Sequence, residues 1–238
     1  MRLAKYLASA GLASRRAAEE IVRAGRVRVG GTTITDPALE VGPEDAIAVD
    51  GIVLSPERLR VVYAVNKPAG VVSTARDPQG RPTIVSLVPG DVRLYPVGRL
   101  DIDTTGLILL TNDGALAHRL THPRFEVEKT YRVVVLRPPV REAALKALRA
   151  GVELDDGPTA PARVRRIRPD TLEITIHEGR KRQIKRICEH VGHPVSKLER
   201  VAFGSLALGE LRPGGYRRLS DAEINSLDAG SAARRGGA

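Results

Sequence analysis

The sequence has little aromatic or sulfur chemistry. Its 238 residues include no Trp, one Cys and one Met, and only 3% of them are aromatic. A single cysteine excludes a disulfide framework and any multi-cysteine zinc or iron–sulfur site. The shortage of aromatic residues argues against a protein that stacks successive bases of a single strand.

Long apolar stretches are also missing. No run approaches the roughly 20 apolar residues that a membrane-spanning helix needs. Near the start, Gly11, Ser14, Arg15 and Arg16 interrupt the apolar segment that a secretory signal requires. We therefore expect a cytoplasmic protein that does not act at a membrane.

Positive charge is what the chain has in excess. It carries 38 Lys and Arg against 28 Asp and Glu, a net charge of +10, and 31 of the cations are Arg. Residues 1–31 hold seven cations and two acids, and residues 163–186 hold nine cations and three acids. Because a solvated surface usually mixes both signs and Arg binds phosphate bidentately, this imbalance indicates a nucleic-acid partner.

The first 58 residues have the pattern of a small RNA-binding domain. Apolar residues at helical spacing predict a helix from Leu3 to Ala10, and Ser14 is a suitable N-cap for a second helix. Alternation over 26–29, a turn at Gly30-Gly31 and a return over 32–34 predict a β-hairpin. The cations expected to contact RNA are Arg2, Lys5, Arg15, Arg16, Arg23 and Arg26.

Residues 59–227 are expected to form a second domain. Strand patterns and helix patterns follow one another without strict alternation, which predicts an α+β fold with a central mixed or antiparallel sheet. One of the strands is expected at Val201–Leu208. Residues 228–238 are rich in Gly, Ala and Arg, and we expect a disordered tail there.

Two segments of this second domain could carry chemistry. Tyr95–Gly106 is a polar, glycine-containing loop before an apolar strand, and in an extended chain Asp101 and Asp103 would face the same side. From spacing alone, these acids could be catalytic, or could only structure the loop or pair with Arg99. Glu178–His190 predicts a helix with one apolar side and one cationic side.

The same segments resemble the RsuA/RluB family of pseudouridine synthases, and most closely its RluB branch, which modifies large-subunit ribosomal RNA. The N-terminal pattern is similar to the RNA-binding domain named after ribosomal protein S4. The resemblance extends over about residues 1–220, and its motifs follow in the family's order: Gly98–Asp101 with Thr104–Leu107, Leu110–Gly114, Lys129–Tyr131, Glu178–Arg186, and Lys197-Leu198 with Arg200.

The resemblance implies roles for individual residues. Asp101 takes the position of the family's essential carboxylate, which attacks the target nucleoside at the sugar or, in another view, at the base. Lys185 takes the position of the cation that offsets the cost of a charged carboxylate in a dry pocket, where many relatives have Arg. Tyr131 corresponds to the tyrosine against the target base and is a candidate for handling its C5 proton.

Further residues are expected to bind the substrate: Leu198 in the uracil pocket, Arg99 in holding the flipped nucleotide, and Arg180 with Lys181 on the RNA. The product is an isomer of the substrate, so the resemblance implies no cofactor and no metal. The expected partner is ribosomal RNA, and the expected state is a monomer.

Other functions fit part of the pattern. Small-subunit ribosomal RNA is the alternative substrate. A non-catalytic RNA-binding assembly factor would explain the charge but need not keep Asp101, Tyr131 and Lys185 together. A nucleoside or glycoside hydrolase could use Asp101 and Asp103 as an acid–base pair but would not explain the basic surface. Cys188, His190 and His193 do not have the spacing of a common zinc site.

Overall fold

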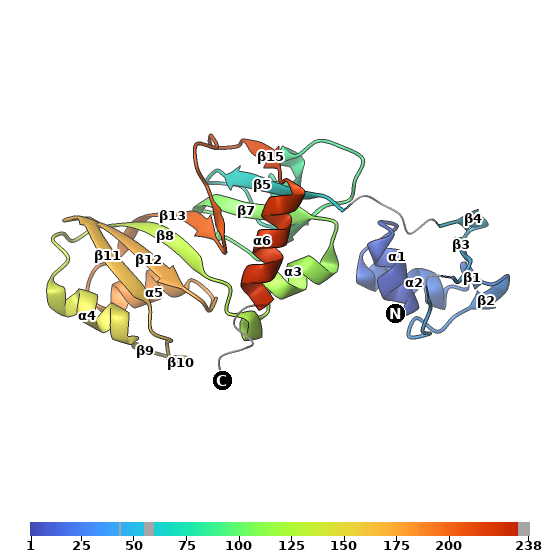
Figure 1. Ribbon diagram of the computed structural model, residues 1–238, viewed down its shortest axis with the longest axis horizontal. Coiled ribbons are helices and arrows are strands. Elements are labelled where there is room, and N and C mark those ends of the chain that lie inside the picture. The colour runs from blue at the N-terminus through green and yellow to red at the C-terminus, as the bar shows by residue number, and fades with distance from the viewer. Residues whose placement is uncertain (43, 55–59, 233–238) are drawn as a thin grey trace. The chain divides into compact units, whose positions relative to one another are not determined.

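The computed structural model describes residues 1–42, 44–54 and 60–232, and the chain divides into two compact units (Figure 1). The first unit contains Met1–Val61 together with residues 91–93 and 112–114, and the second contains the rest. The domain boundary expected at residues 58 and 59 falls in 55–59, outside the described residues, and stays a prediction.

The first unit is two short helices on a small antiparallel sheet. Its elements are α1 (Leu3–Ser9), α2 (Arg15–Arg23), β1 (Val27–Val29), β2 (Thr32–Ile34), β3 (Ile47–Val49) and β4 (Ile52–Val53), with strand order β2-β1-β3-β4. The Ser14 hydroxyl accepts a hydrogen bond from the Ala17 N–H at 3.1 Å, which caps α2 as the sequence predicted. Leu3, Leu7, Val22 and Ile47 are fully buried in its core.

The second unit is built on a nine-stranded mixed sheet in the order β11-β12-β8-β13-β7-β5-β15, with β6 beside β7 and β14 beside β13. Only β13 and β7 pair in parallel among the described strands; the other neighbours are antiparallel. The strands are β5 (Val62–Lys67), β6 (Tyr95–Val97), β7 (Thr105–Thr111), β8 (Lys129–Val135), β11 (Arg163–Arg168), β12 (Thr171–Ile176), β13 (Val195–Phe203), β14 (Leu206–Ala207) and β15 (Tyr216–Arg218). A separate hairpin joins β9 (Glu153–Leu154) to β10 (Gly157–Pro158).

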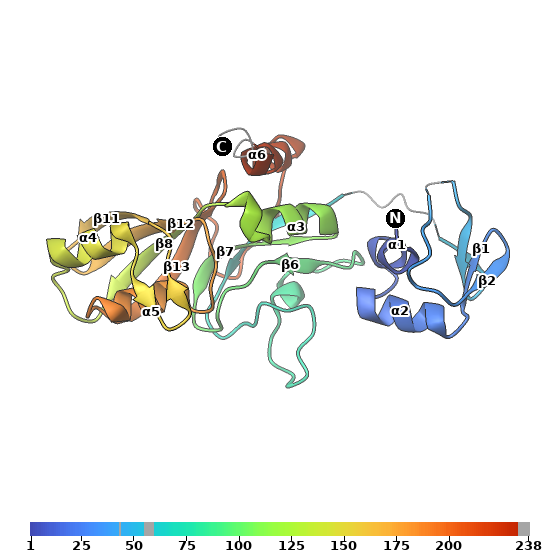
Figure 2. The ribbon, with the colours of Figure 1, turned by 90° about the horizontal axis from the view of Figure 1, so that it is seen from below.

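Helices flank this sheet, and α5 lies on the opposite side from α3 and α6 (Figure 2). The helical segments are η1 (Ile84–Leu87), α3 (Gly114–Thr121), η2 (Pro123–Phe125), α4 (Glu142–Ala150), α5 (Gln183–His190) and α6 (Asp221–Ala232). Apolar residues of α3 and α6, such as Leu116 and Leu227, pack with Leu107 and Leu109 of β7. The buried side of α5 carries Ile184, Ile187 and Cys188. The α+β fold with a mixed sheet is confirmed.

Two local predictions are wrong. Asp221–Ala232 is helical, so residues 228–232 do not belong to a disordered tail, and Asp228 forms an ion pair with Arg119 of α3. Residues 233–238 of that predicted tail lie outside the described residues. The strand expected at Val201–Leu208 instead begins at Val195, ends at Phe203 and turns at Gly204 into β14.

Candidate active site

The loop between β6 and β7 carries Asp101 in a tight turn. The Thr104 N–H donates a hydrogen bond to the Asp101 carbonyl at 3.1 Å, so the chain is not extended there as the sequence analysis assumed. Lys67, at the end of β5, is fully buried and stabilises this turn. Its ammonium donates hydrogen bonds to the carbonyls of Pro68, Ile102 and Thr104 at 2.8–3.2 Å. A rigid strand end therefore fixes the position of the Asp101 loop.

Lys185 of α5 bridges the two carboxylates of this loop. Its Nζ lies 3.6 Å from Asp101 Oδ2 and 2.5 Å from Asp103 Oδ1. The hydrogen bond from Lys185 lowers the pKa of the Asp103 carboxyl below its ordinary value. Although the turn differs from the expected extended chain, both acids meet the same cation, and Arg99 is not their partner in an observed salt bridge.

Asp101 lines a cavity of about 640 Å³. Apolar and cationic side chains form the rest of its walls. Tyr131 of β8 and Leu198 of β13 line it, and these residues are only 9% and 8% exposed. Neighbouring strands bring these residues together, because β13 pairs with β8 in a register that sets Leu198 opposite Val133 and Arg200 opposite Tyr131. The cavity thus joins a carboxylate, a tyrosine and an apolar wall, which suits a planar, partly polar ring.

The remaining residues predicted to bind substrate also line this cavity: Arg99, Arg180 and Lys181. Arg180 is largely occupied, because its guanidinium donates to the carbonyls of Asp156, Gly157 and Pro158 and so holds the β9–β10 hairpin. Lys181 is exposed and precedes α5. A role for Arg180 in substrate binding stays a prediction, with few of its N–H groups left for RNA.

Four residues at or beside the site were given no functional role from the sequence: Lys67, Thr104, Lys129 and Arg200. Lys129 precedes Tyr131 by two positions on β8, so both point to the same side of the sheet. Burial, and to a lesser extent the charge of Arg200, lower the pKa of Lys129 to about 8, against the opposing effect of Glu178. Two signals were available in the sequence. The family motifs include Thr104, Lys129 and Arg200, and Lys129 and Arg200 each lie two positions from a predicted site residue, Tyr131 or Leu198.

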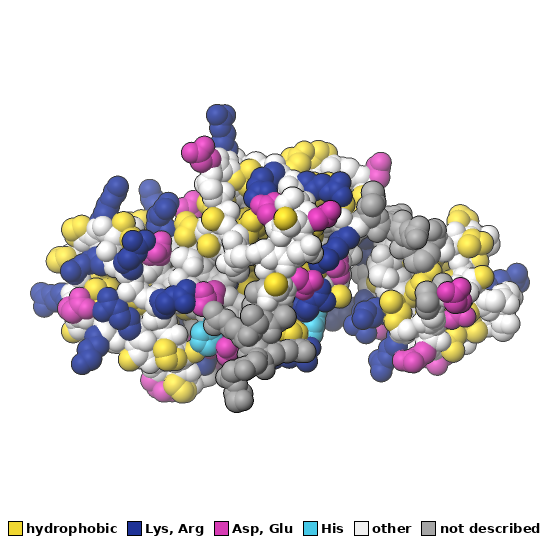
Figure 3. Space-filling view, in the orientation of Figure 1, with side chains coloured by type: hydrophobic (Ala, Val, Ile, Leu, Met, Phe, Trp, Pro, Cys, Tyr) yellow, Lys and Arg dark blue, Asp and Glu magenta, His cyan; other side chains and the backbone are white. Residues whose placement is uncertain are grey.

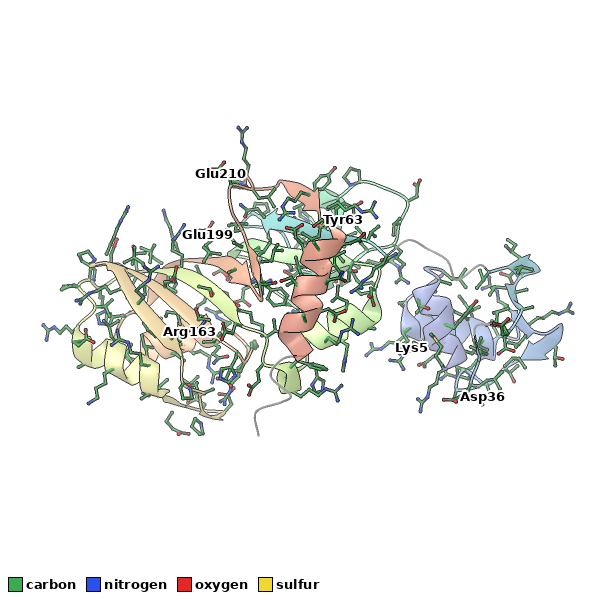
Figure 4. The ribbon with its side chains drawn as sticks, in the orientation of Figure 1. Lys5, Asp36, Tyr63, Arg163, Glu199 and Glu210 are labelled. Carbon is green, nitrogen blue, oxygen red and sulfur yellow. The ribbon has the colours of Figure 1, made fainter. Side chains whose placement is uncertain are left out.

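The cations of the first unit fall into two groups. Arg23 pairs with Glu19, and Arg26 makes a two-pronged contact with Asp50. The hydrogen bond between Arg26 and Asp50 raises the pKa of Arg26 and lowers the pKa of Asp50. Arg2, Lys5, Arg15 and Arg16 are exposed, and within the described chain no acidic partner is recorded for them. Lys5 projects from α1 in Figure 4.

A wider groove of about 1020 Å³ lies on the other face of the same sheet. Thr130 and Arg132 line it, and they alternate along β8 with the residues that face the Asp101 cavity. Three of its four arginines are paired with acids: Arg132 with Glu199, Arg163 with Glu128 and Arg165 with Glu173. Arg163 and Glu199 are visible on this face in Figure 4, and Figure 3 shows acidic side chains between the basic ones. This groove lacks the carboxylate–tyrosine arrangement, so the smaller cavity is the candidate active site.

The described part of the chain has neither a metal-binding cluster nor a membrane-spanning helix. Residues 1–42, 44–54 and 60–232 contain no group of three His, Cys, Asp or Glu side chains arranged to hold a metal ion. Cys188 is fully buried on the apolar side of α5. In the same residues, none of the helices has the length and apolar character needed to cross a bilayer.

Comparison with known proteins identifies the family. Residues 61–190 match the RNA pseudouridylate synthase family, and residues 1–47 match the S4 domain. The chain is 41% identical over 235 residues to ribosomal large subunit pseudouridine synthase B of Bacillus subtilis, with 96% of each chain covered. This chain belongs to the RNA pseudouridine synthases. The resemblance to the RsuA/RluB family is confirmed, and with it an isomerase that acts on RNA.

Relatives named as small-subunit enzymes are nearly as similar to this chain as the large-subunit enzyme of Bacillus subtilis. Ribosomal small subunit pseudouridine synthase A of Salmonella typhimurium is 40% identical over 232 residues, covering 95% of this chain and all of that protein. A solved structure described as a pseudouridylate synthase superposes with a TM-score of 0.71 at 34% identity, covering 95% of this chain and 99% of the other. The pseudouridine synthase fold of the second unit is therefore shown by an experimental neighbour.

Proposed function

We propose that this pseudouridine synthase isomerises a specific uridine of large-subunit ribosomal RNA, with Asp101 as the essential nucleophile. The observation that carries the proposal is the Asp101 carboxylate at the mouth of a cavity lined by Tyr131 and Leu198, with Lys185 Nζ 3.6 Å away. Membership of the family supplies the reaction, and the S4 domain supplies a second RNA-binding surface.

The proposed reaction needs only the RNA and the side chains of the site. The Asp101 carboxylate attacks C1′ of the target nucleotide, and the electron pair of the C1′–N1 bond leaves with the uracil. The ring turns, and its C5 then forms a bond to C1′ while the carboxylate departs with the electron pair of the ester bond. The C5 proton is lost and N1 gains a proton, with Tyr131 as the group that handles the C5 proton. Lys185 Nζ lies 3.6 Å from Asp101 Oδ2 and provides a counter-charge to the carboxylate before attack and after release.

A base inside an RNA helix cannot reach this cavity, so the target nucleotide must be flipped out. Arg99 lines the cavity and precedes Leu100 and Asp101 in the same loop. We propose that its guanidinium contacts the backbone of the flipped nucleotide. Lys181 is placed to contact a neighbouring phosphate.

Mapping of pseudouridine by carbodiimide modification and primer extension tests the proposal. Protein-free transcripts of both ribosomal RNAs are incubated with the wild-type enzyme and with Asp101→Asn. We expect one new stop in the large-subunit transcript that depends on Asp101, and a rate loss of more than about 10³-fold in the variant with RNA affinity retained.

Asp103→Asn is the matched control, because Asp103 is two residues away, has the same chemistry and contacts the same Lys185. We expect it to retain activity within about tenfold of the wild type. An equal loss of activity in Asp101→Asn and Asp103→Asn would show that both acids only maintain the structure of the loop. Asp101 would then not be the nucleophile.

The same experiment tests whether the substrate is large-subunit ribosomal RNA. A stop confined to the small-subunit transcript would keep the reaction and reverse the substrate, which the 40% identity to the Salmonella small-subunit enzyme makes the second candidate. No stop in either transcript or in precursor ribosomal particles, with RNA binding intact, would favour a non-catalytic binding protein. Release of free uracil would instead indicate a hydrolase.

A further inference from the structure

Two buried polar atoms have no hydrogen-bond partner in the described residues: Thr104 Oγ1 and Arg200 Nη2. Both residues are only 2% exposed. Leaving a buried donor or acceptor unpaired costs about 1–3 kcal/mol, more for a charged group, so native proteins rarely do it without a reason.

Both residues line the cavity that contains Asp101. They come from the two strands that pair in parallel, since Thr104 immediately precedes β7 and Arg200 of β13 lies opposite Gly106. Gly106 makes this close approach possible, because a Cβ at that position would lie 2.3 Å from the Arg200 carbonyl oxygen. Two residues nearly one hundred positions apart in the sequence, each with an unpaired buried atom, therefore line the same cavity.

The Arg200 guanidinium is held in place before any ligand arrives. Its Nε donates to the Leu107 carbonyl at 2.6 Å, and its Cζ lies 4.8 Å from the centre of the Phe203 ring. No acid is recorded in an ion pair with Arg200 anywhere in the described chain. A fixed, dry cation without a counter-charge favours a ligand that offers an oxygen and develops negative charge.

The reaction supplies such a ligand. A uracil ring has two carbonyl oxygens flanking an N–H at its polar edge, and it takes a full negative charge when the C1′–N1 electron pair leaves with the ring. That charge is shared between N1 and the two carbonyl oxygens. A hydrogen bond to one of those oxygens is stronger after bond breaking than before, which is the condition for catalysis rather than simple binding.

We propose that Thr104 and Arg200 bind the polar edge of the target uracil, and that Arg200 stabilises the negative charge of the ring when it detaches from C1′. This inference rests on the proposed function. Thr104 Oγ1 can accept from the ring N–H or donate to a carbonyl, and Arg200 Nη2 donates to a carbonyl oxygen. No proton leaves either residue, and the charge of the ring is consumed when C5 forms its bond to C1′.

A phosphate of the RNA backbone is the competing ligand for Arg200. If Arg200 binds a phosphate, Arg200→Met should weaken RNA binding. If Arg200 binds the uracil, the same variant should bind RNA normally and slow the chemical step. Single-turnover rates at saturating enzyme, measured beside RNA dissociation constants, separate the two.

We expect Arg200→Met to lower the single-turnover rate by about 10²- to 10³-fold, as for the loss of one oxyanion donor. Its RNA dissociation constant should stay within about threefold of the wild type, because the interaction forms mainly after bond breaking. Thr104→Val should lower the rate about tenfold, and Thr104→Ser, which restores a hydroxyl, should recover most of it. Arg217→Met is the matched control: Arg217 is exposed, pairs with Glu223 and lies outside the cavity, so its rate should not change.

A second measurement changes the RNA instead of the protein, so its first result comes from the wild-type enzyme and Arg200→Met serves only for comparison. The target uridine is replaced by 2-thiouridine or by 4-thiouridine, since sulfur accepts hydrogen bonds more weakly than oxygen. One analogue should slow the wild-type enzyme markedly, and the same analogue should slow Arg200→Met no further.

Additive losses for both analogues, or a loss of RNA affinity in Arg200→Met that matches its loss of rate, would overturn the inference. Full activity of Arg200→Met and Thr104→Val would overturn it as well, while leaving the proposed function intact. A wild-type enzyme without any pseudouridine product would instead overturn the proposed function itself.

Discussion

Gly106 is the residue at which β7 can pass directly beside β13. It has φ +99°, and a Cβ there would lie 2.3 Å from the oxygen and 2.7 Å from the nitrogen of Arg200. These are backbone atoms in the middle of a sheet, so they cannot move aside cheaply. We predict that Gly106→Ala lowers the free energy of unfolding by more than about 4 kcal/mol, measured by urea denaturation.

Gly192→Ala is the control for this substitution. Gly192 has a similar φ of +84°, but nothing lies within 4 Å of the position its Cβ would take. It should cost only the backbone strain, about 1–2 kcal/mol. If both variants lose the same stability, the close approach of the two strands is not what requires Gly106.

Lys67 is a fully buried cation with three carbonyl partners, and burial lowers its pKa from 10.5 to about 8, against the opposing charges of Asp103 and Asp101. Below about pH 8, Lys67 is protonated in the folded and the unfolded protein, and the full cost of burying its charge is present. Between about pH 8 and pH 10.5 the folded protein loses this proton while the unfolded chain retains it, so stability rises with pH.

We therefore predict that the stability of wild type relative to Lys67→Met increases by about 2 kcal/mol between pH 8 and pH 10. Urea denaturation of both proteins at the two pH values measures it, and the comparison cancels the titration of other groups such as Lys129. A difference that stays constant, or that falls with pH, would contradict the lowered pKa of Lys67.

At the scale of elements, local patterns predicted most helices and strands but not where the site lies. The apolar spacing of α1, the Ser14 cap of α2 and the Gly30-Gly31 turn each depend on neighbours in the sequence, and each is confirmed. The first half of β13 was missed because its buried face includes Arg200, which any hydrophobic pattern counts as exposed. Arg200 is buried at the cavity wall, and this cavity forms only when the sheet is folded. Its burial therefore could not be predicted from the neighbouring residues in the sequence.

The site itself joins a loop, a strand and a helix whose predicted residues are Asp101, Tyr131 and Lys185. No periodicity connects positions so far apart, so their association could be expected only from the family resemblance. The structure adds the physical reason, since β8, β13 and α5 surround one cavity and Lys185 reaches the Asp101 loop. The tight turn at Asp101 could not be read from the spacing of two acids, because it depends on Lys67 beneath it.

Helix α5 makes a further prediction through its buried side. Cys188 is fully buried there, and burial raises the pKa of its thiol to about 12. Because the thiolate is the reactive form, the native protein should react with a disulfide reagent at pH 8 many times more slowly than the unfolded protein. Unfolding in urea should release one reactive thiol per chain, the only cysteine in the sequence. Rapid reaction of the native protein would mean that α5 opens readily from the sheet.

At the scale of the whole molecule, the net charge of +10 matters for RNA only where cations are free to meet phosphates. Several cations are already neutralised by acids, among them Arg26 by Asp50, Arg163 by Glu128 and Arg186 by Asp156. The excess charge therefore acts through cations without such partners, and the first unit presents several of them at exposed positions of α1 and α2. Association should weaken steeply with salt, since each phosphate contact releases counterions.

We predict that replacing both Arg15 and Arg16 with Gln reduces the slope of log affinity against log salt by about 1.4–1.8, the value for two lost phosphate contacts. Arg26→Gln removes a charge from the same unit but one that Asp50 already neutralises, so it should leave the slope nearly unchanged. Filter binding of a ribosomal RNA fragment over a range of salt concentrations measures all three proteins. A slope that the double variant does not change, or that Arg26→Gln reduces equally, would mean that net charge rather than the free cations of α2 governs binding. The distinction matters because only cations at fixed positions can hold a bound RNA in one orientation.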